Sequence, residues 1–196
     1  MFFVSRKTEF LTKSTRKRAF RPLAFQFRVT ALLLSLLLLV TTLSACGTQP
    51  ESTGLQFPDF TMQDLKGNAV TQDIFKEHDL TVVNIWGTFC PPCIEEMPDL
   101  GKLNRTLESD YNATLVGIVV DVRDQETLDL ANQILIGSEA AHLNLLIGQD
   151  VSEFLSRYEY VPTTLFIDAN GQLVGEPVVG GNSYEEYLKE VKSRLP

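Results

Sequence analysis

Two apolar runs mark the centre of the predicted fold. Residues 81–86 (TVVNIW) form a β-prone run, and residues 113–121 (ATLVGIVVD) form a second one. The second run is continuous and lacks the polar alternation of a half-exposed strand, so it predicts a strand buried on both faces. Between the two runs, residues 91 to about 107 have the spacing of a helix that is interrupted at Pro98. A strand followed by a helix and another strand predicts a βαβ unit.

The flanking sequence adds further alternating elements. Residues 57–71 predict an N-terminal hairpin that turns at Lys66-Gly67-Asn68. Residues 125–136 predict a helix whose buried side includes three apolar residues, Leu128, Leu135 and Ile136. The remaining predictions are a strand at 142–147, a short helix at 151–158, a hairpin of 163–168 and 172–179, and a last helix that Ser183 caps and that runs to Arg194. This order indicates an α/β domain, a mixed central sheet with helices on both faces.

The first 45 residues differ from the rest in charge and hydropathy. They hold eight of the 17 lysines and arginines and one of the 25 acidic residues, so their formal charge is +7, while residues 46–196 carry −15. A basic start, an apolar run at 29–43 and small residues after it have the layout of a secretory signal. The apolar run is shorter than the roughly 20 residues that cross a bilayer; an uncleaved anchor is the alternative. The acidity of the remainder argues against nucleic acid as a partner.

Residues 43–47 (LSACG) resemble the lipobox of bacterial lipoproteins, in which the cysteine is acylated and becomes the new N-terminus. The resemblance implies that Cys46 is a lipid attachment point. The alternative is a free cysteine near a signal cleavage site, which would be a liability in an oxidising compartment. The predicted divisions are a lipoprotein signal peptide at 1–45, a lipidated N-terminus and flexible tether at 46–56, and one folded domain at 57–196.

The stretch WGTFCPPCIEEMP carries the candidate chemistry, because Cys90 and Cys93 stand three apart between the predicted strand and helix. A structural zinc site needs four ligands, usually from two separated pairs. A second cysteine pair is absent, and His78 and His142 are isolated in polar or loop-like sequence. A purely structural disulfide is the plain alternative, but closing so short a loop gains little entropy. The pair therefore indicates redox chemistry, with no metal.

Three other chemistries do not match the sequence. Attachment of c-type haem needs a histidine directly after the second cysteine, where Ile94 stands. Copper chaperones of the Sco type have a wider cysteine spacing. Peroxiredoxins place Thr or Ser three residues, and Pro seven residues, before the attacking cysteine; these positions hold Gly87 and Val83. Peroxide reduction is therefore not the predicted main chemistry.

The start of the predicted helix assigns roles to the two cysteines. Cys90 stands at the helix N-terminus, where the macrodipole favours a thiolate, so it is the predicted nucleophile. Cys93 lies one turn into the helix and is the predicted resolving thiol. Pro91 and Pro92 have no N–H to donate to the Cys90 sulfur, so the thiolate is only modestly stabilised. A weakly stabilised thiolate makes a more reducing couple, which predicts a reductase rather than an oxidase.

CPPC between a strand and a helix, followed by Val161-Pro162-Thr163 before a terminal hairpin and helix, resembles the thioredoxin fold. Within that fold the chain resembles the TlpA/ResA branch of membrane-tethered thiol–disulfide oxidoreductases. The features that carry this resemblance are the N-terminal hairpin, WGTFCPPCIEEMP, the helical insertion at 125–136 and VPTTLFIDANGQLV. The resemblance covers about residues 57–194.

The resemblance implies roles for further residues. Glu96 matches the acidic active-site residue of ResA-like proteins, three residues after the second cysteine, and would accept its proton. Asn84 stands where typical thioredoxins carry a buried aspartate, and it cannot act as a base. Pro162 resembles the cis-proline that faces CxxC, and the backbone of Val161 would bind an extended substrate. Trp86 would border the site or lie in the core. The candidate substrate-binding residues are Trp86, Pro91, Pro92, Val161 and Pro162.

The resemblance also implies a place in the cell and partners. It predicts an exported enzyme, lipid-anchored to the membrane and extracytoplasmic, that needs no cofactor. Its clients would be protein disulfides, such as those of apocytochrome c or a methionine sulfoxide reductase. A CcdA/DsbD-type transmembrane protein would supply electrons. The alternatives are a disulfide-forming oxidase and a non-catalytic lipoprotein that uses the thioredoxin fold to bind a partner.

Overall fold

The structure of the chain is a computed structural model that describes residues 52–196. The predicted signal peptide and Cys46 lie outside the described residues. The strands are β1 Ser52–Gln56, β2 Thr61–Gln63, β3 Ala69–Thr71, β4 Leu80–Trp86, β5 Ala113–Val119, β6 Leu143–Leu146, β7 Thr163–Asp168, β8 Gln172–Val174 and β9 Val178–Val179. The helices are the 3-10 helix η1 Gln72–Glu77, α2 Pro91–Asp110, α3 Gln125–Gly137, α4 Gln149–Leu155 and α5 Tyr184–Arg194. Within this part of the chain, no helix combines the length and apolar content that crossing a membrane requires.

A mixed sheet forms the centre of the domain. Its strand order is β1-β8-β7-β4-β5-β6, and β9 also pairs with β7. Strands β4, β5 and β6 are parallel, with Trp86 opposite Val119 and Val119 opposite Leu146. Strand β7 runs antiparallel to β4, which sets Asn84 opposite Thr164. The carboxyl ends of the parallel strands therefore lie at the same end of the sheet, where the chain leaves β4 for the cysteine motif.

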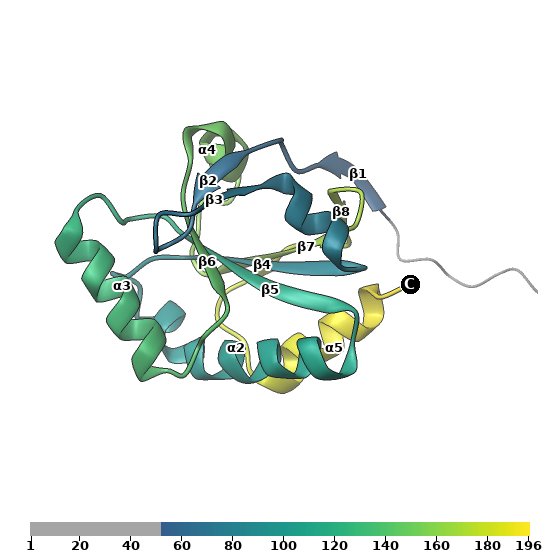
Figure 1. Cartoon of the computed structure of the whole chain (residues 1–196). Coiled ribbons are helices and arrows are strands. Elements are labelled where there is room, and N and C mark those ends of the chain that lie inside the picture. The colour runs from purple at the N-terminus through teal and green to yellow at the C-terminus, as the bar shows by residue number, and fades with distance from the viewer. Residues whose placement is uncertain (1–51) are drawn as a thin grey trace, which may run out of the picture. The chain divides into compact units, whose positions relative to one another are not determined.

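Both faces of the sheet are covered, as the sequence predicted (Figure 1). Side chains of α2, α3 and α5 pack with alternate residues of β4 and β5 in one apolar cluster. The N-terminal hairpin β2–β3, η1 and α4 contribute to a second cluster with the intervening residues of these strands. Four phenylalanines pack edge to face in this second cluster: Phe57, Phe60, Phe75 and Phe154. The predicted α/β thioredoxin-fold class is confirmed.

Two predictions about the helices were wrong. Helix α2 continues through Pro98 without an interruption. The proline ring lies on the exposed side of the helix, where water can bond the carbonyl that the missing N–H leaves free. In α3, Ala131 and Leu135 face the core one turn apart, whereas Ile136 is 78% exposed. Ile136 follows Leu135 directly and so points about 100° away from the buried stripe.

Two strand boundaries also differ from the predictions. Residues 52–56, predicted as part of a flexible tether, form β1, which pairs antiparallel with β8. This edge strand is mostly exposed, so its sequence carries no apolar signal. The predicted strand 172–179 is divided into β8 and β9, both paired with β7. Gly175, with φ 67°, and the following Pro177 separate the two pieces.

Candidate redox site at the start of helix α2

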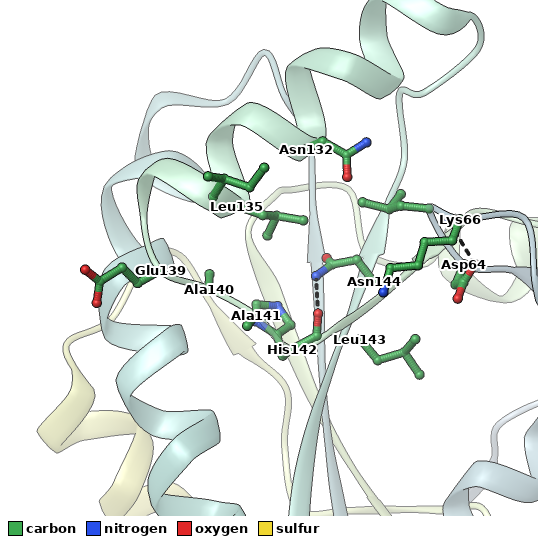
Figure 2. A pocket seen from close by; sticks show the side chains of 12 residues that line it. Asp64, Lys66, Asn132, Leu135, Glu139, Ala140, Ala141, His142, Leu143 and Asn144 are labelled. Carbon is green, nitrogen blue, oxygen red and sulfur yellow. Dashed lines mark hydrogen bonds between the residues drawn. The ribbon is translucent and has the colours of Figure 1, made fainter.

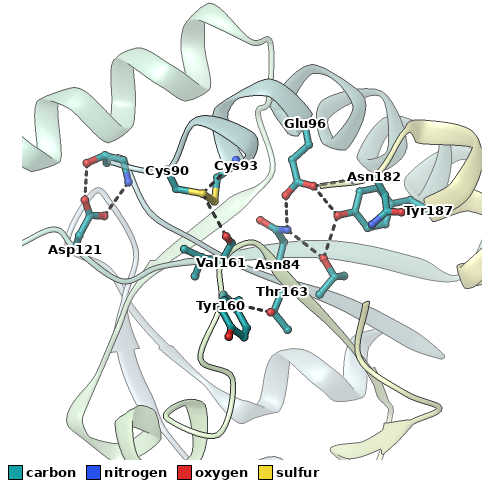
Figure 3. The surroundings of a disulfide bond; sticks show 12 residues. Asn84, Cys90, Cys93, Glu96, Asp121, Tyr160, Val161, Thr163, Asn182 and Tyr187 are labelled. Carbon is teal, nitrogen blue, oxygen red and sulfur yellow. Dashed lines mark hydrogen bonds between the residues drawn. A yellow bond between two sulfur atoms is a disulfide. The ribbon is translucent and has the colours of Figure 1, made fainter. Parts of the chain in front are cut away.

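Cys90 and Cys93 form a disulfide at the N-terminus of α2 (Figure 3). Cys90 is the N-cap residue, with the extended backbone that this position requires, and the two prolines occupy the first helical positions. Cys90 is 5% exposed and Cys93 is 0% exposed. Cys90 is therefore the more accessible of the two cysteines, although it presents only a small area to solvent.

The Cys90 sulfur has a backbone donor inside the motif. The amide of Cys93 donates to Cys90 Sγ at 3.3 Å. Pro91 and Pro92 have no amide hydrogen, so this is the first N–H of the helix that can reach the sulfur. A thiolate on Cys90 would gain this hydrogen bond and the positive end of the helix macrodipole.

The loop before the motif is fixed by a carboxylate from the neighbouring strand end. Asp121 follows β5 and accepts two hydrogen bonds from Thr88, one from its amide at 2.9 Å and one from its hydroxyl at 2.6 Å. The amide of Cys90 donates to Gly87 O at 3.2 Å. These contacts hold the loop that presents Cys90 at the sheet edge. Asp121 was missed as a site residue because its partner lies on another strand end, 33 positions away.

The segment before β7 faces the disulfide from the other side. The Val161–Pro162 peptide bond is cis, as predicted. Val161 O lies 3.5 Å from Cys90 Sγ (Figure 3). The Thr163 hydroxyl donates to Tyr160 O at 2.7 Å, and the Gly180 amide donates to Pro162 O at 2.8 Å. The backbone beside the disulfide is therefore fixed by one hydrogen bond within its own segment and by one from the segment after β9.

Glu96 is buried one turn after Cys93 and accepts three hydrogen bonds. Asn84 Nδ2 donates to Oε1 at 2.9 Å, while the Tyr187 hydroxyl and the Asn182 amide donate to Oε2 at 2.7 and 3.2 Å. Burial raises the pKa of the Glu96 carboxyl, and these three donors oppose the rise. Glu96 therefore has the raised pKa and the position of a group that could exchange a proton with Cys93.

Four polar residues lie around Glu96, and only one of them could be picked out from the sequence. Asn84 was noted for its position before the motif, but Thr164, Asn182 and Tyr187 were not. Tyr187 lies 91 residues from Glu96, and its sequence signal is only that of a buried position in an amphipathic helix. Burial and the nearby Glu96 raise the pKa of the Tyr187 hydroxyl, so it is a hydrogen-bond donor at neutral pH.

Trp86 does not border the surface around the disulfide. Its side chain is fully buried in the core, and Nε1 donates to Asn144 Oδ1 at 2.8 Å. The two side chains meet over Gly117, where an added Cβ would come 1.9 Å from Asn144 Oδ1. The structure thus favours the core alternative for Trp86. Pro91 and Pro92 are exposed next to the disulfide, and Val161 is half-buried beside it.

His142 is buried, which the sequence did not predict. Burial lowers its pKa to about 4. Neither ring nitrogen has a hydrogen-bond partner within residues 52–196. A hollow of about 750 Å³ lies beside it, between the end of α3, β6 and the β2–β3 turn (Figure 2). Its lining includes Lys66, Glu139 and Asn144 but none of the residues around the disulfide.

The described residues do not bring a metal-ligand set together. Within 52–196, no group of three or more His, Cys, Asp or Glu side chains lies close enough to hold an ion.

Exposed apolar side chains surround the disulfide. Phe89 directly precedes Cys90 and is 67% exposed, and Tyr160 directly precedes Val161 and is 68% exposed. Val179 is also exposed and pairs with Thr163 just after the cis-proline. Large apolar groups in solvent around a reactive pair are typical of a surface that contacts another protein.

Comparisons with known proteins agree on the family. The family model described as AhpC/TSA matches residues 53–176. The thiol-disulfide oxidoreductase ResA of Bacillus thuringiensis subsp. konkukian is 27% identical over 144 residues, which cover 72% of this chain and 78% of the relative. The thiol:disulfide interchange protein DsbE of Vibrio cholerae is 31% identical over 155 residues, covering 71% of this chain and 77% of the relative.

Solved structures match the same part of the chain. A thioredoxin-family thiol:disulfide interchange protein from Chlorobium tepidum superposes with a TM-score of 0.62 at 24% identity, covering 74% of this chain and 99% of the other. A thiol:disulfide interchange protein from Bacteroides sp. has a TM-score of 0.56 at 26% identity, covering 72% and 89%. Both proteins are named for thiol:disulfide interchange, and both likenesses support the fold of this chain.

Proposed function

The chain belongs to the AhpC/TSA family and is a thiol–disulfide oxidoreductase of the ResA/DsbE type, and from this premise we propose that it reduces disulfide bonds of extracytoplasmic proteins. The observation that carries the proposal is the Cys90–Cys93 disulfide at the start of α2 with the buried Glu96 one turn beyond it. A thiol pair at a helix N-terminus with an adjacent carboxyl group has what two successive exchange steps need: a nucleophile, a resolving thiol and a proton acceptor.

In the first step, the reduced enzyme attacks its client. The Cys90 thiolate forms a bond to one sulfur of the client disulfide, the client S–S bond breaks, and the second client sulfur leaves as a thiolate. The amide of Cys93 is placed to stabilise the attacking thiolate. The leaving thiolate takes its proton from water.

In the second step, Cys93 resolves the mixed disulfide. The Glu96 carboxylate takes the Cys93 proton, Cys93 Sγ bonds to Cys90 Sγ, and the remaining client sulfur leaves as a thiolate. The client has then gained two electrons, and the enzyme is left with the Cys90–Cys93 disulfide seen in the structure. Glu96 returns its proton to the leaving thiolate or to water. A transmembrane donor of the CcdA/DsbD type would reduce the disulfide again.

The direction of electron flow rests on how little the Cys90 thiolate is stabilised. The two prolines remove two amide donors that the first turn of a helix would otherwise offer. The acidic chain after residue 45, with a formal charge of −15, disfavours a further anion. Oxidases of this class are strong because their reduced form is stabilised. These features support a reductase over the alternative, a disulfide-forming oxidase.

Protein clients fit the surroundings of the disulfide. Phe89 and Tyr160 offer apolar contact area on two sides, and the backbone of Val161 could pair with an extended client segment. Candidate clients are apocytochrome c and an extracytoplasmic methionine sulfoxide reductase. Substitution of Cys93 by Ser tests this proposal, because the variant can attack a client but cannot resolve the mixed disulfide.

The Cys93→Ser variant should accumulate client proteins that are released by a reductant, and Cys90→Ser is the matched control that should accumulate none. Identification of the trapped proteins names the clients. If the Cys93→Ser protein is present and folded in the cells but traps nothing, a non-catalytic binding lipoprotein becomes the better explanation.

Attachment to the membrane through a lipid on Cys46 is the second part of the proposal. Cys46 lies outside the described residues, so its support is the resemblance of LSACG to a lipobox. The Cys46→Ser variant should lose fatty-acid incorporation and leave the membrane fraction, whereas Cys93→Ser should stay there. Retention of Cys46→Ser in the membrane without fatty acid would favour the uncleaved anchor.

A further inference from the structure

Tyr187 connects the last helix to the candidate proton acceptor. It is fully buried on α5, and its hydroxyl donates to Glu96 Oε2 at 2.7 Å. The same hydroxyl oxygen lies 3.3 Å from Thr164 Oγ1 on β7. A buried tyrosine needs a hydrogen-bond partner for its hydroxyl. Here the partner is Glu96, a buried acid one turn after Cys93, so Tyr187 contacts the group that is proposed to take the Cys93 proton.

Four side chains from four elements form a closed ring of hydrogen bonds. Asn84 Nδ2 on β4 donates to Glu96 Oε1 at 2.9 Å and to Thr164 Oγ1 at 3.1 Å. Tyr187 has a single hydroxyl hydrogen, and it goes to Glu96, so the hydrogen shared with Thr164 comes from Thr164. The bonds therefore run from Asn84 along both sides of the ring and end on the Glu96 carboxylate (Figure 3). Bonds in such a chain strengthen one another.

The ionised form of Glu96 is stabilised by hydrogen bonds rather than by a neighbouring cation. Within residues 52–196, no ion pair reaches this carboxylate. The titratable groups that face it are Cys93 and Asp99 on its own helix and Tyr187 on α5. Strands β4 and β7 present the neutral Asn84 and Thr164, and the segment before α5 presents the amide of Asn182. Loss of one donor is therefore not compensated by a nearby positive charge.

We propose, building on the proposed function, that Tyr187 is a positioning residue for the resolving step: its hydroxyl holds the Glu96 carboxylate ionised and oriented so that it can take the proton of Cys93. The bonds formed and broken are the same as in the resolving step described above. The proton passes from Cys93 Sγ to Glu96, the Cys93–Cys90 bond forms, and the bond from Cys90 to the client breaks. Tyr187 keeps its own proton throughout and acts only through Glu96.

The test compares two tyrosines of the same helix. Tyr187→Phe removes the hydroxyl that bonds Glu96. Tyr184→Phe is the matched control, because Tyr184 stands one turn earlier and its hydroxyl meets Thr106 instead. For each protein, a mixed disulfide of Cys90 with a chromogenic small thiol is prepared, and the rate at which Cys93 releases that thiol is measured against pH.

Removal of a donor to a buried carboxylate favours its protonated form, so the pH at which release accelerates should move upward by about one unit in Tyr187→Phe. On the rising limb of the profile, where the rate follows the ionised fraction of Glu96, release should then fall about tenfold. Tyr184→Phe should keep the wild-type profile. Thr164→Val, which removes the group that supports the Tyr187 hydroxyl from behind, should shift the profile in the same direction by less and serves if Tyr187→Phe does not fold.

Two results overturn the inference. The first is a Tyr187→Phe or Thr164→Val profile that coincides with the wild type in a folded protein. The second is an equal shift in Tyr184→Phe, which would point to a general effect of the helix. Failure of the wild-type protein to release the thiol at any pH would instead defeat the proposed function itself.

Discussion

At the residue scale, the behaviour of Glu96 is decided by two opposing effects. Burial favours the protonated acid, and donors from Asn84, Asn182 and Tyr187 favour the carboxylate. The first effect is the larger, so the pKa is raised. A carboxyl group whose pKa is moved toward neutrality is better suited to exchange protons with a thiol than an ordinary surface glutamate.

Glu96→Gln should slow release of a small thiol from the Cys90 mixed disulfide by roughly 100-fold at neutral pH, because an amide cannot accept the Cys93 proton. In the wild type the rate should rise with pH as Glu96 ionises, and the variant should lack that rise. Glu95→Gln is the control, since Glu95 is exposed on the same helix. A pH profile that survives in Glu96→Gln would show that another group accepts the proton.

How far the site could be predicted depends on where its residues lie in the sequence. Cys90, Cys93 and Glu96 stand three residues apart within two helical turns, so the spacing predicts that they lie on one side of the helix. The position of Pro162 came from the family pattern. Tyr187 and Asn182 reach Glu96 only through the packing of α5 on α2, which no local spacing encodes. The core position of Trp86 likewise depends on Asn144, a residue 58 positions away.

At the scale of elements, buried segments were predictable and exposed ones were not. Strands β4, β5 and β7 are buried along most of their length, so their apolar runs reveal them. Strand β1 lies at the sheet edge with little burial, and its composition resembles a linker. The cap at Ser183 was predicted from the serine before the helix, and the structure adds the bond from Glu186 that completes a capping box.

The hydrogen bond between Trp86 and Asn144 joins β4 to β6 across β5. Trp86→Phe should lower the free energy of unfolding by about 2 kcal/mol, because Asn144 Oδ1 loses its donor inside the core. Urea unfolding followed by circular dichroism measures this loss, since the chain has one tryptophan and the variant has none. The rate at which Trp86→Phe reduces a protein disulfide should differ little from that of the wild type. A stable variant with impaired reduction would instead return Trp86 to the substrate surface.

At the scale of the whole domain, His142 links stability to pH. Its pKa is about 4 in the folded state, against 6.5 for the free side chain. The unfolded chain therefore binds more protons than the folded chain between these two pH values. The contribution of His142 to the free energy of unfolding is thus fully present above pH 6.5 and is lost as the pH falls toward 4. The expected loss is about 3 kcal/mol.

The His142→Leu variant should show a flatter fall of stability across this range, as measured by urea unfolding at several pH values. His78→Gln is the control, because it removes a partly exposed imidazole. Equal slopes in the wild type and His142→Leu would mean that the histidine is protonated or solvated in the folded protein.

The direction in which the Cys90–Cys93 couple carries electrons decides between a reductase and an oxidase. The prolines at the helix start and the acidity of the domain both disfavour the reduced thiolate, and a couple with a poorly stabilised reduced form donates electrons. The reduction potential of this couple is the most direct test, determined by equilibrating the protein with a dithiol buffer of known potential. We predict a value of about −250 mV or lower. A value near about −120 mV would contradict a reductase and identify a disulfide-forming oxidase.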